Sequence, residues 1–328
     1  YTFKEVILIL GNYNSSFINL SGYKKLNGSQ ILRENITYIL NTLKAYVDKF
    51  ESKKKIIHIF NTKYLLDNRK IENLPIGLFG DFYSHELSFS LIDKNDYKNI
   101  NSIFQKCNLK IKKILLRNFV KGAQICNNNQ DLDTFFLVKI SKKKSQIFFF
   151  ENNTLKFEQF FHFGFDIITQ DISKITSLKK NTIQKILEKI DFDVKYTHDE
   201  LIEDDFFKED VYRKIKKKLI YDIMAARIEE ISEIILFKNI NFKSNYKSSN
   251  ILFLEIDEEF NNQSLSKIYE NIFSLSKSIE IRASNNRNSE SLISTAHKLV
   301  HFGWKKEAIP TTHTKKSLIA RFFDAIFD

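Results

Sequence analysis

A short polar segment between two apolar runs has the residue types to attract a phosphate. Its members are Ser141, Lys142, Lys143, Lys144 and Ser145. The runs on either side, 135–140 and 146–150, are rich in residues that favour strands, so the segment is predicted to be the turn of a β-hairpin. Three ammonium groups attract phosphate by charge, but a backbone phosphate loop needs glycine for close approach of its N–H groups, and this turn has none. We therefore favour a solvated hairpin turn.

Other patterns that could do chemistry are incomplete. His297 and His301 stand at a metal-ligand spacing on a predicted helix, but no glutamate follows the first histidine and no third ligand is evident. Cys107 and Cys126 are too far apart for a metal knuckle, and no nucleophile elbow or Ser-His-Asp pattern occurs. We predict no catalytic residue, no metal site and no enzyme.

The composition bounds the class of protein. The 328 residues, 43% of them hydrophobic, can form two domains or one domain with subdomains. The formal net charge of +11 would suit an anionic partner, but no Arg-rich run or aromatic-interleaved module supports nucleic acid, and we predict no such partner. The 2 cysteines fit a reducing cytoplasm, and no apolar run has transmembrane length. Because the chain begins at Tyr1 and not at Met, we expect that a preceding stretch is missing.

Residues 315–328 carry an amphipathic helical pattern. Its apolar stripe, in which residues recur at i, i+1, i+4, i+5, i+8 and i+9, consists of Leu318, Ile319, Phe322, Phe323, Ile326 and Phe327. Lys315, Lys316 and Arg321 can meet anionic headgroups. A helix docked on the body of the same chain is the alternative. The polar segment before the helix and its terminal position favour an anionic membrane surface.

Periodicity predicts the elements that carry these residues. Strands are expected at 6–10, 15–20, 55–60, 64–67, 85–92, 110–116, 135–140, 146–150, 155–165, 251–256 and 279–283. Helices are expected at 30–49, 95–107, 119–130, 169–175, 181–190, 206–237, 265–276 and 289–300. The basic run 213–218 would lie in the first turns of the helix 206–237, and 304–314 would be a polar linker.

Five stretches occur in the order in which similar stretches occur in the FtsA family of bacterial cell-division proteins. They are Val6-Ile-Leu-Ile-Leu-Gly11, His58-Ile-Phe-Asn-Thr-Lys-Tyr-Leu-Leu-Asp67, Pro75-Ile-Gly-Leu-Phe-Gly80, Gly164-Phe-Asp-Ile-Ile-Thr-Gln-Asp-Ile172 and Ile223-Met-Ala-Ala-Arg-Ile-Glu-Glu-Ile231. Their order and spacing cover nearly the whole chain, which therefore resembles this family.

The resemblance implies an α/β, actin-like (ribonuclease-H-like) fold with a small inserted α/β subdomain and a C-terminal amphipathic helix. It also implies a division of the chain into subdomains. Residues 1–92 would form the FtsA-type inserted subdomain, and residues 93–133 a remnant of the first actin-like subdomain. Residues 134–172 with 226–305 would form the second actin-like core subdomain, 173–225 a helical partner-binding subdomain, and 306–328 a linker and membrane-targeting helix.

The family's nucleotide-binding motifs are altered in this chain. Its Asp-x-Gly-Gly-Gly-Thr phosphate loop is replaced around 139–145, and Lys cannot position a metal-bound water as Asp does. Its adenosine loop is replaced by Leu254-Glu255-Ile256, whose large side chains would fill the nucleoside's space. Vestigial cofactor-binding residues are expected at Ser141–Ser145, Gly164, Arg227 and Glu230. We expect no cofactor, unless a preceding segment supplies the phosphate loop needed for ATP and magnesium.

The resemblance implies an adaptor that tethers FtsZ filaments to the cytoplasmic face of the bacterial inner membrane at the division site. Its partners would be the FtsZ C-terminal tail, bound by Arg213, Lys216 and Lys217, the anionic membrane, and further copies of itself. Two alternatives stay open: a working actin-like ATPase and an actin-like scaffold for pilus assembly. The altered loops argue against the first, and the terminal helix argues against the second.

Overall fold

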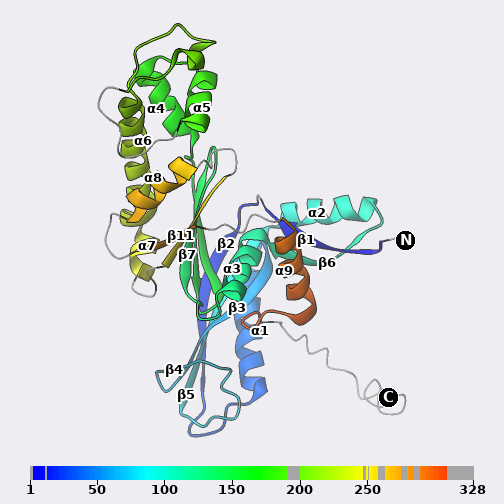
Figure 1. The fold of residues 1–328 in the computed structure, drawn as a ribbon. Helices are drawn as coiled ribbons and strands as arrows, with labels where there is room; N and C mark the ends of the chain where they lie inside the picture. Colours follow the sequence, from blue (N-terminus) through cyan, green and yellow to red (C-terminus); the bar gives the residue numbers. More distant parts are fainter. Residues whose placement is uncertain are drawn as a thin grey trace. The chain divides into compact units, whose positions relative to one another are not determined.

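The computed structural model describes residues 3–11, 13–190, 200–246, 249, 251–257, 263–274, 279–283 and 289–308. They form two compact units, whose elements are labelled in Figure 1. Unit 1 comprises Tyr1–Arg117 with Ala296–Asp328, and unit 2 comprises Asn118–Thr295. In the described part of the chain, no helix combines the length and the apolar character needed to cross a bilayer.

Unit 1 contains an antiparallel sheet with the strand order β2-β5-β3-β4. Its strands are β2 (Ser16–Lys25), β3 (Lys54–Leu66), β4 (Arg69–Ile71) and β5 (Phe82–Asp93). Helix α1 (Arg33–Phe50) buries Leu40 and Val47 against it. The two short strands expected at 55–60 and 64–67 are one strand, β3, whose pairing with β5 is interrupted by bulges at Ile57 and Thr62. These bulges broke the alternation on which the prediction relied.

A second sheet of unit 1 is the parallel pair β1 (Glu5–Leu10) and β6 (Lys110–Leu116). Helix α2 (Lys94–Lys106) precedes β6 and begins where the Asp93 side chain accepts a hydrogen bond from Asn95 N at 2.7 Å. The four-stranded sheet is thus inserted in the chain between two strands that pair with each other.

Unit 2 is built on the sheet β11-β10-β7-β8-β9. The antiparallel part is β7 (Phe135–Ile140), β8 (Ser145–Glu151) and β9 (Thr154–Phe161), and β10 (Ile251–Ile256) and β11 (Glu280–Ala283) continue it in parallel with β7. Every residue of β8 is buried, which explains its unbroken apolar run. One face is covered by α3 (Arg117–Asn128), where a Cβ on Gly122 would lie 1.8 Å from Phe150 Cζ, so only glycine permits this approach.

Helices cover the other face of this sheet and share one core with it. They include α4 (Asp166–Thr176), α5 (Lys180–Lys189), α6 (Lys217–Ser232), α7 (Ile240–Asn245) and α8 (Gln263–Ser274). Helices α4 and α5 lie side by side at the top of Figure 1. The last described helix, α9 (Ser289–Phe302), crosses the boundary between the units in sequence.

The single helix expected at 206–237 is wrong at both ends. Residues 204–207 form a 3-10 turn, and the chain just before α6 is extended, because Leu201 and Lys216 form an antiparallel bridge. After Ser232 a π-turn, Glu233–Phe237, closes with Lys238 N donating to Glu233 O at 2.6 Å. The π-turn holds one residue more than an α-helical turn. Apolar side chains in it stay buried although they no longer follow the 3.6-residue period. The sequence pattern therefore resembled one continuous helix.

The polar linker expected at 304–314 is also wrong at its start. Asn61 N donates to Lys306 O at 2.7 Å, and Ala308 N donates to Ile59 O at 2.8 Å, so residues 306–308 pair with β3. Backbone pairing can order a polar segment that lacks any apolar pattern. The predicted terminal helix 315–328 lies outside the described residues.

Candidate functional site

The lysine-rich turn joins β7 to β8 and packs on the start of α4. Ser141 N donates to Lys144 O at 2.9 Å and closes the turn. A Cβ on Gly164 would lie 2.0 Å from Ser141 O, so the close approach of turn and helix requires glycine at this position.

The first N–H groups of α4 are the donors that could hold an anion, but the turn itself uses them. Phe165 N donates to Ser141 O at 3.0 Å, and Asp166 N donates to Lys142 O at 2.8 Å. The hydroxyl of Ser145 is buried and donates to Phe163 O at 2.8 Å. Lys142 and Lys143 are exposed. The turn therefore offers positive charge at its surface, while its nearest backbone donors have partners within the protein.

An ion cluster lies where β7 and β10 end side by side. Lys139 Nζ is 3.5 Å from Glu255 Oε1 and 3.3 Å from Asp257 Oδ1, and Lys121 Nζ is 3.1 Å from Glu255 Oε2. The parallel register places Glu255 beside Lys139, and Asp257 N donates to Ile140 O at 3.0 Å. The two carboxylates thus balance the two ammonium groups, so this cluster has no net positive charge to attract a phosphate.

The prediction that Leu254-Glu255-Ile256 replaces an adenosine loop is wrong. All three residues belong to strand β10, where Leu254 and Ile256 are buried in the core of unit 2. The strand expected at 251–256 is confirmed by β10. The residues that follow, 258–262, lie outside the described part of the chain.

A groove of about 470 Å³ lies between α4 and α6. Its apolar part includes Ile175, which is 59% exposed, and Ala226. Its charged part includes Lys174 and Asp222, together with an ionic triad in which Arg227 binds Asp171 and Glu230. The groove combines exposed apolar surface with charges of both signs.

The eight residues expected as a vestigial cofactor site fall into two groups along α4. The turn and Gly164 lie at the start of α4, where Ser141 O and Lys142 O accept from Phe165 N and Asp166 N. Arg227 binds Asp171 five residues further along, with its Nε 2.5 Å from Oδ2. Five residues of helix, or about 7.5 Å of rise, separate Asp166 from Asp171. Arg227 and Glu230 line the groove and bond to each other.

The basic residues expected to bind a partner do not form one face of a helix. Arg213 Nη1 donates to Thr176 O at 2.8 Å and so caps the end of α4, next to Ile175. Lys216 is the residue before α6, and Lys217 begins that helix, 3.7 Å from Glu200 and 3.8 Å from Glu203. Arg213 therefore stabilises the C-terminal end of α4, where Ile175 also lies.

The groove between α4 and α6 was not predicted from the sequence. Ile175 follows Ile168 and Ile172 in helical phase, so the pattern places it in the core. It is exposed in the structure, and one of the α6 residues that line the same groove, Ala226, is small. We find no sequence signal that would have revealed this.

The two histidines with metal-ligand spacing both lie on α9. The rings of His297 and His301 lie 4.2 Å apart between centroids on α9. Among the residues that the structure describes, no group of three or more His, Cys, Asp or Glu side chains could hold a metal ion.

Comparison with solved structures defines the class of fold. A chain of the PilM–PilN type IV pilus biogenesis complex superposes with a TM-score of 0.50 at 8% identity, covering 88% of this chain and 76% of that one. The fold is actin-like, as expected from the sequence.

In sequence the chain is similar to FtsA. The FtsA of Neisseria meningitidis serogroup B is 22% identical over 232 residues, which cover 70% of this chain and 55% of that protein. The FtsA of Buchnera aphidicola is 21% identical over 182 residues, or 56% of this chain and 43% of that protein. The chain spans about half the length of the curated relatives it matches. No protein-family model matches it.

Proposed function

We propose that this chain is an actin-like cell-division adaptor that holds FtsZ filaments to the cytoplasmic face of the membrane at the division site. The similarity to FtsA over 232 residues carries the proposal, and the actin-like fold supports it. Membrane attachment is assigned to the amphipathic residues 315–328, whose pattern alone supports it.

We infer that the adaptor works without binding or hydrolysing ATP. Three features support this inference. The turn 141–145 lacks glycine, the N–H groups of Phe165 and Asp166 already have acceptors, and Lys139 is paired with Glu255 and Asp257. A phosphate would have to displace these internal contacts.

We propose that the groove between α4 and α6 receives the FtsZ tail, a short and partly acidic peptide. An apolar peptide side chain would pack on Ile175 and Ala226, and a peptide carboxylate would meet Lys174. Arg213 holds the end of α4 beside this surface, and Lys216 and Lys217 would attract the peptide over a longer range.

Binding of a labelled FtsZ tail peptide to the full chain tests this assignment. Ile175→Glu places a charge on the apolar part of the groove and should weaken binding about tenfold or more, since tenfold corresponds to about 1.4 kcal/mol. Ala226→Leu should do the same by filling the hollow. Ile293→Glu is the matched control, because Ile293 is 61% exposed in the same unit and lies outside the groove. If Ile175→Glu binds like the wild type, the groove is not the site.

A scaffold for pilus assembly is the second candidate, favoured by the fold similarity to the PilM–PilN complex. The same assay separates the two functions when PilN is offered alongside the FtsZ tail. Saturable binding of PilN without binding of the tail would replace the division adaptor by the pilus scaffold.

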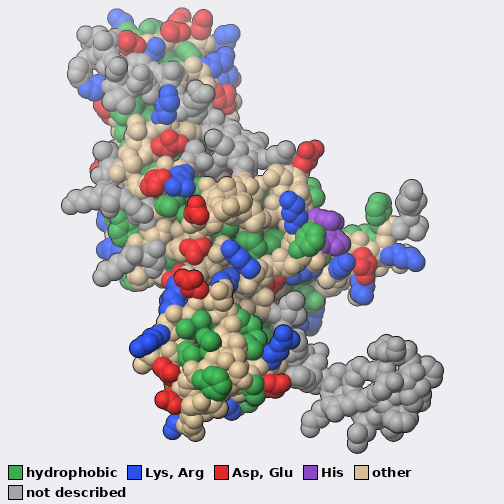
Figure 2. Space-filling model, turned by 60° about the horizontal axis from the view of Figure 1, so that its bottom comes forward, with side chains coloured by type: hydrophobic (Ala, Val, Ile, Leu, Met, Phe, Trp, Pro, Cys, Tyr) green, Lys and Arg blue, Asp and Glu red, His purple; other side chains and the backbone are tan. Residues whose placement is uncertain are grey.

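Contact between copies is the third part of the proposal. Apolar side chains are exposed around the turn-rich end of the β2-β5-β3-β4 sheet, at the bottom of Figure 2. We call this surface the tip patch; it comprises Tyr23, Leu74, Ile76, Leu78, Phe79 and Phe82. Tyr23 and Phe82 stack with ring centroids 5.2 Å apart, and Phe79 is 70% exposed. Exposed apolar clusters of this kind commonly mark protein interfaces.

A further inference from the structure

Residues Lys306–Ala308 act as an added strand on β3. Phe60 and Glu307 form an antiparallel bridge, flanked by the hydrogen bonds from Asn61 N to Lys306 O and from Ala308 N to Ile59 O. We call these three residues the strap. The side chain of Lys306 adds a bond from its Nζ to Glu72 O at 3.2 Å.

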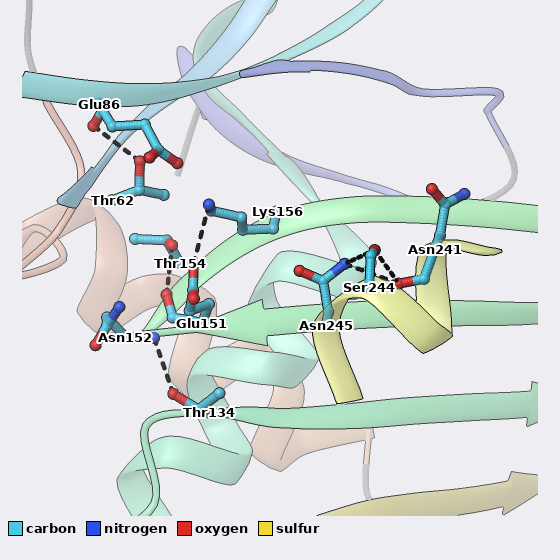
Figure 3. Close-up of polar contacts among 10 residues, drawn as sticks. All are labelled: Thr62, Glu86, Thr134, Glu151, Asn152, Thr154, Lys156, Asn241, Ser244 and Asn245. Atoms are coloured by element: carbon cyan, nitrogen blue, oxygen red, sulfur yellow. Dashed lines mark hydrogen bonds and ion pairs between the residues drawn. The ribbon is translucent and has the colours of Figure 1, made fainter. Parts of the chain in front are cut away.

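The part of β3 that receives the strap is bounded by the two bulges. One edge of β3 pairs with β5, and on the other edge β4 pairs only with 64–66. Thr62, the second bulge, turns its hydroxyl onto Glu86 O at 2.8 Å, as Figure 3 shows. Because β4 pairs only with 64–66, the edge of β3 at 59–61 is open to the strap.

A buried polar cluster lies under the strap. His58 Nδ1 is 2.9 Å from Glu307 Oε1, and Lys113 Nζ is 2.7 Å from Glu307 Oε2. Leu116 N donates to His58 Nε2 at 3.2 Å, so Nε2 must be an acceptor and Nδ1 carries the proton given to Glu307. The imidazole is fully buried and, in this arrangement, neutral.

We propose that His58, Glu307 and Lys113 form a latch that fastens the strap to β3, and that protonation of His58 opens it. An imidazolium has no lone pair for Leu116 N–H, which would be left buried without its acceptor. The latch thus joins three segments far apart in sequence: β3, β6 and the strap.

Protonation at mildly acidic pH should loosen the latch. The groups that face His58 include Glu307 from the strap, Lys113 and Leu116 N–H from β6, and the Phe60 ring, 5.5 Å away on β3. Burial lowers the pKa of His58 below its ordinary value of 6.5, although the hydrogen bond to Glu307 opposes this shift. The open state therefore binds the proton more readily, and the latch is tight at neutral pH and weakens as pH falls below about 6.5.

The strap has a mechanical consequence that rests on the proposed tether. Any pull on the chain after residue 308 would be taken up by β3 and the latch before it reaches α9. Opening the latch would lengthen the tether by the strap residues and those between the strap and α9.

Hydrogen exchange of the Asn61 and Ala308 amides in the full chain tests the latch. Protection factors, corrected for intrinsic exchange, should fall about tenfold between pH 7.5 and pH 5.5, because pH 5.5 lies one unit below the ordinary histidine pKa of 6.5 and each such unit is a factor of about ten. His58→Gln keeps a donor and an acceptor but cannot be protonated, and it should remove the pH dependence. Glu307→Gln should reduce protection at both pH values.

His85→Gln is the matched control, because His85 is the other fully buried histidine described in this sheet and bonds to Asn61 Oδ1 at 2.9 Å through its Nε2. It should leave the pH response at Ala308 in place. Two results would overturn the latch. One is protection at Ala308 that changes neither with pH nor in Glu307→Gln. The other is protection at Ala308 that falls only when protection falls throughout unit 1. Vesicle binding is measured separately: its absence in the wild type would refute the tether and leave the exchange result valid.

Discussion

Lys139 shows at the scale of one residue why nucleotide should not bind. Its ammonium lies between Glu255 and Asp257, where it is already neutralised. A ligand with a micromolar Kd would stabilise the chain by about 4 kcal/mol at a thousandfold excess. We expect no rise of Tm when magnesium and about 1 mM ATP are added. Saturable binding of labelled ATP at micromolar concentration would contradict this prediction.

Gly164 matters at the scale of the elements, because it lets the turn 141–145 pack on α4. In Gly164→Ala the new Cβ would lie 2.0 Å from Ser141 O and 2.8 Å from Lys142 O. Because both are backbone atoms, the turn or the helix must move, which should cost about 1–3 kcal/mol of unfolding free energy. Denaturant unfolding measures this loss. Gly11→Ala is the control, since its Cβ would meet Arg117 Cδ at an ordinary 3.5 Å; equal effects would refute the close-packing argument.

The amphipathic helix predicted from the sequence at 315–328 would act at the scale of the whole molecule. Each of its six large apolar side chains gains about 1.5–3 kcal/mol if fully immersed, but ordering the backbone costs about 1–2 kcal/mol per residue. Binding by one copy is therefore marginal and should rise when copies are linked. Phe322→Asp with Phe323→Asp should abolish sedimentation with anionic vesicles, whereas Lys315→Glu with Lys316→Glu should weaken it in part. If the wild-type chain does not sediment with anionic vesicles at low salt, the tether hypothesis is refuted.

The tip patch gives a second prediction at this scale. Phe79→Ser removes its most exposed aromatic ring and should shift the chain towards the monomer in sedimentation at high protein concentration. Ile103→Ser on α2 is the control, because Ile103 is 62% exposed in the same unit and lies outside the patch. An unchanged sedimentation profile of the Phe79 variant would exclude the patch as a contact between copies.

Periodicity predicted most of the elements, because apolar alternation and helical stripes reflect burial directly. The hairpin β7–β8, the strands β1, β6 and β10, and helices α1, α2 and α5 lie within a few residues of their expected bounds. The errors share one cause. Bulges at Ile57 and Thr62, the π-turn after Ser232 and the pairing of the strap all depend on backbone hydrogen bonds, which residue types do not encode.

The candidate site was less predictable than the fold. The absence of glycine from the lysine turn is visible in sequence, but the acceptors of the α4 N–H groups are not. Arg227 and Glu230 were expected at a cofactor, and the structure places them in the groove. The latch joins positions 58, 113 and 307, and contacts at such separations cannot be deduced from one sequence without the fold.

The π-turn Glu233–Phe237 affects how this helix would tolerate a change in chain length. A π-turn holds one residue more than the α-helical turn it replaces, so it is the form that a single inserted residue takes when a helix absorbs it. Ile231, Ile235 and Leu236 all stay buried around it, and the helix before it keeps its register. Removing one residue within 233–237 should therefore convert the turn to α-helix and be tolerated better than removing one from the middle of α6, where every following side chain would rotate by about 100°.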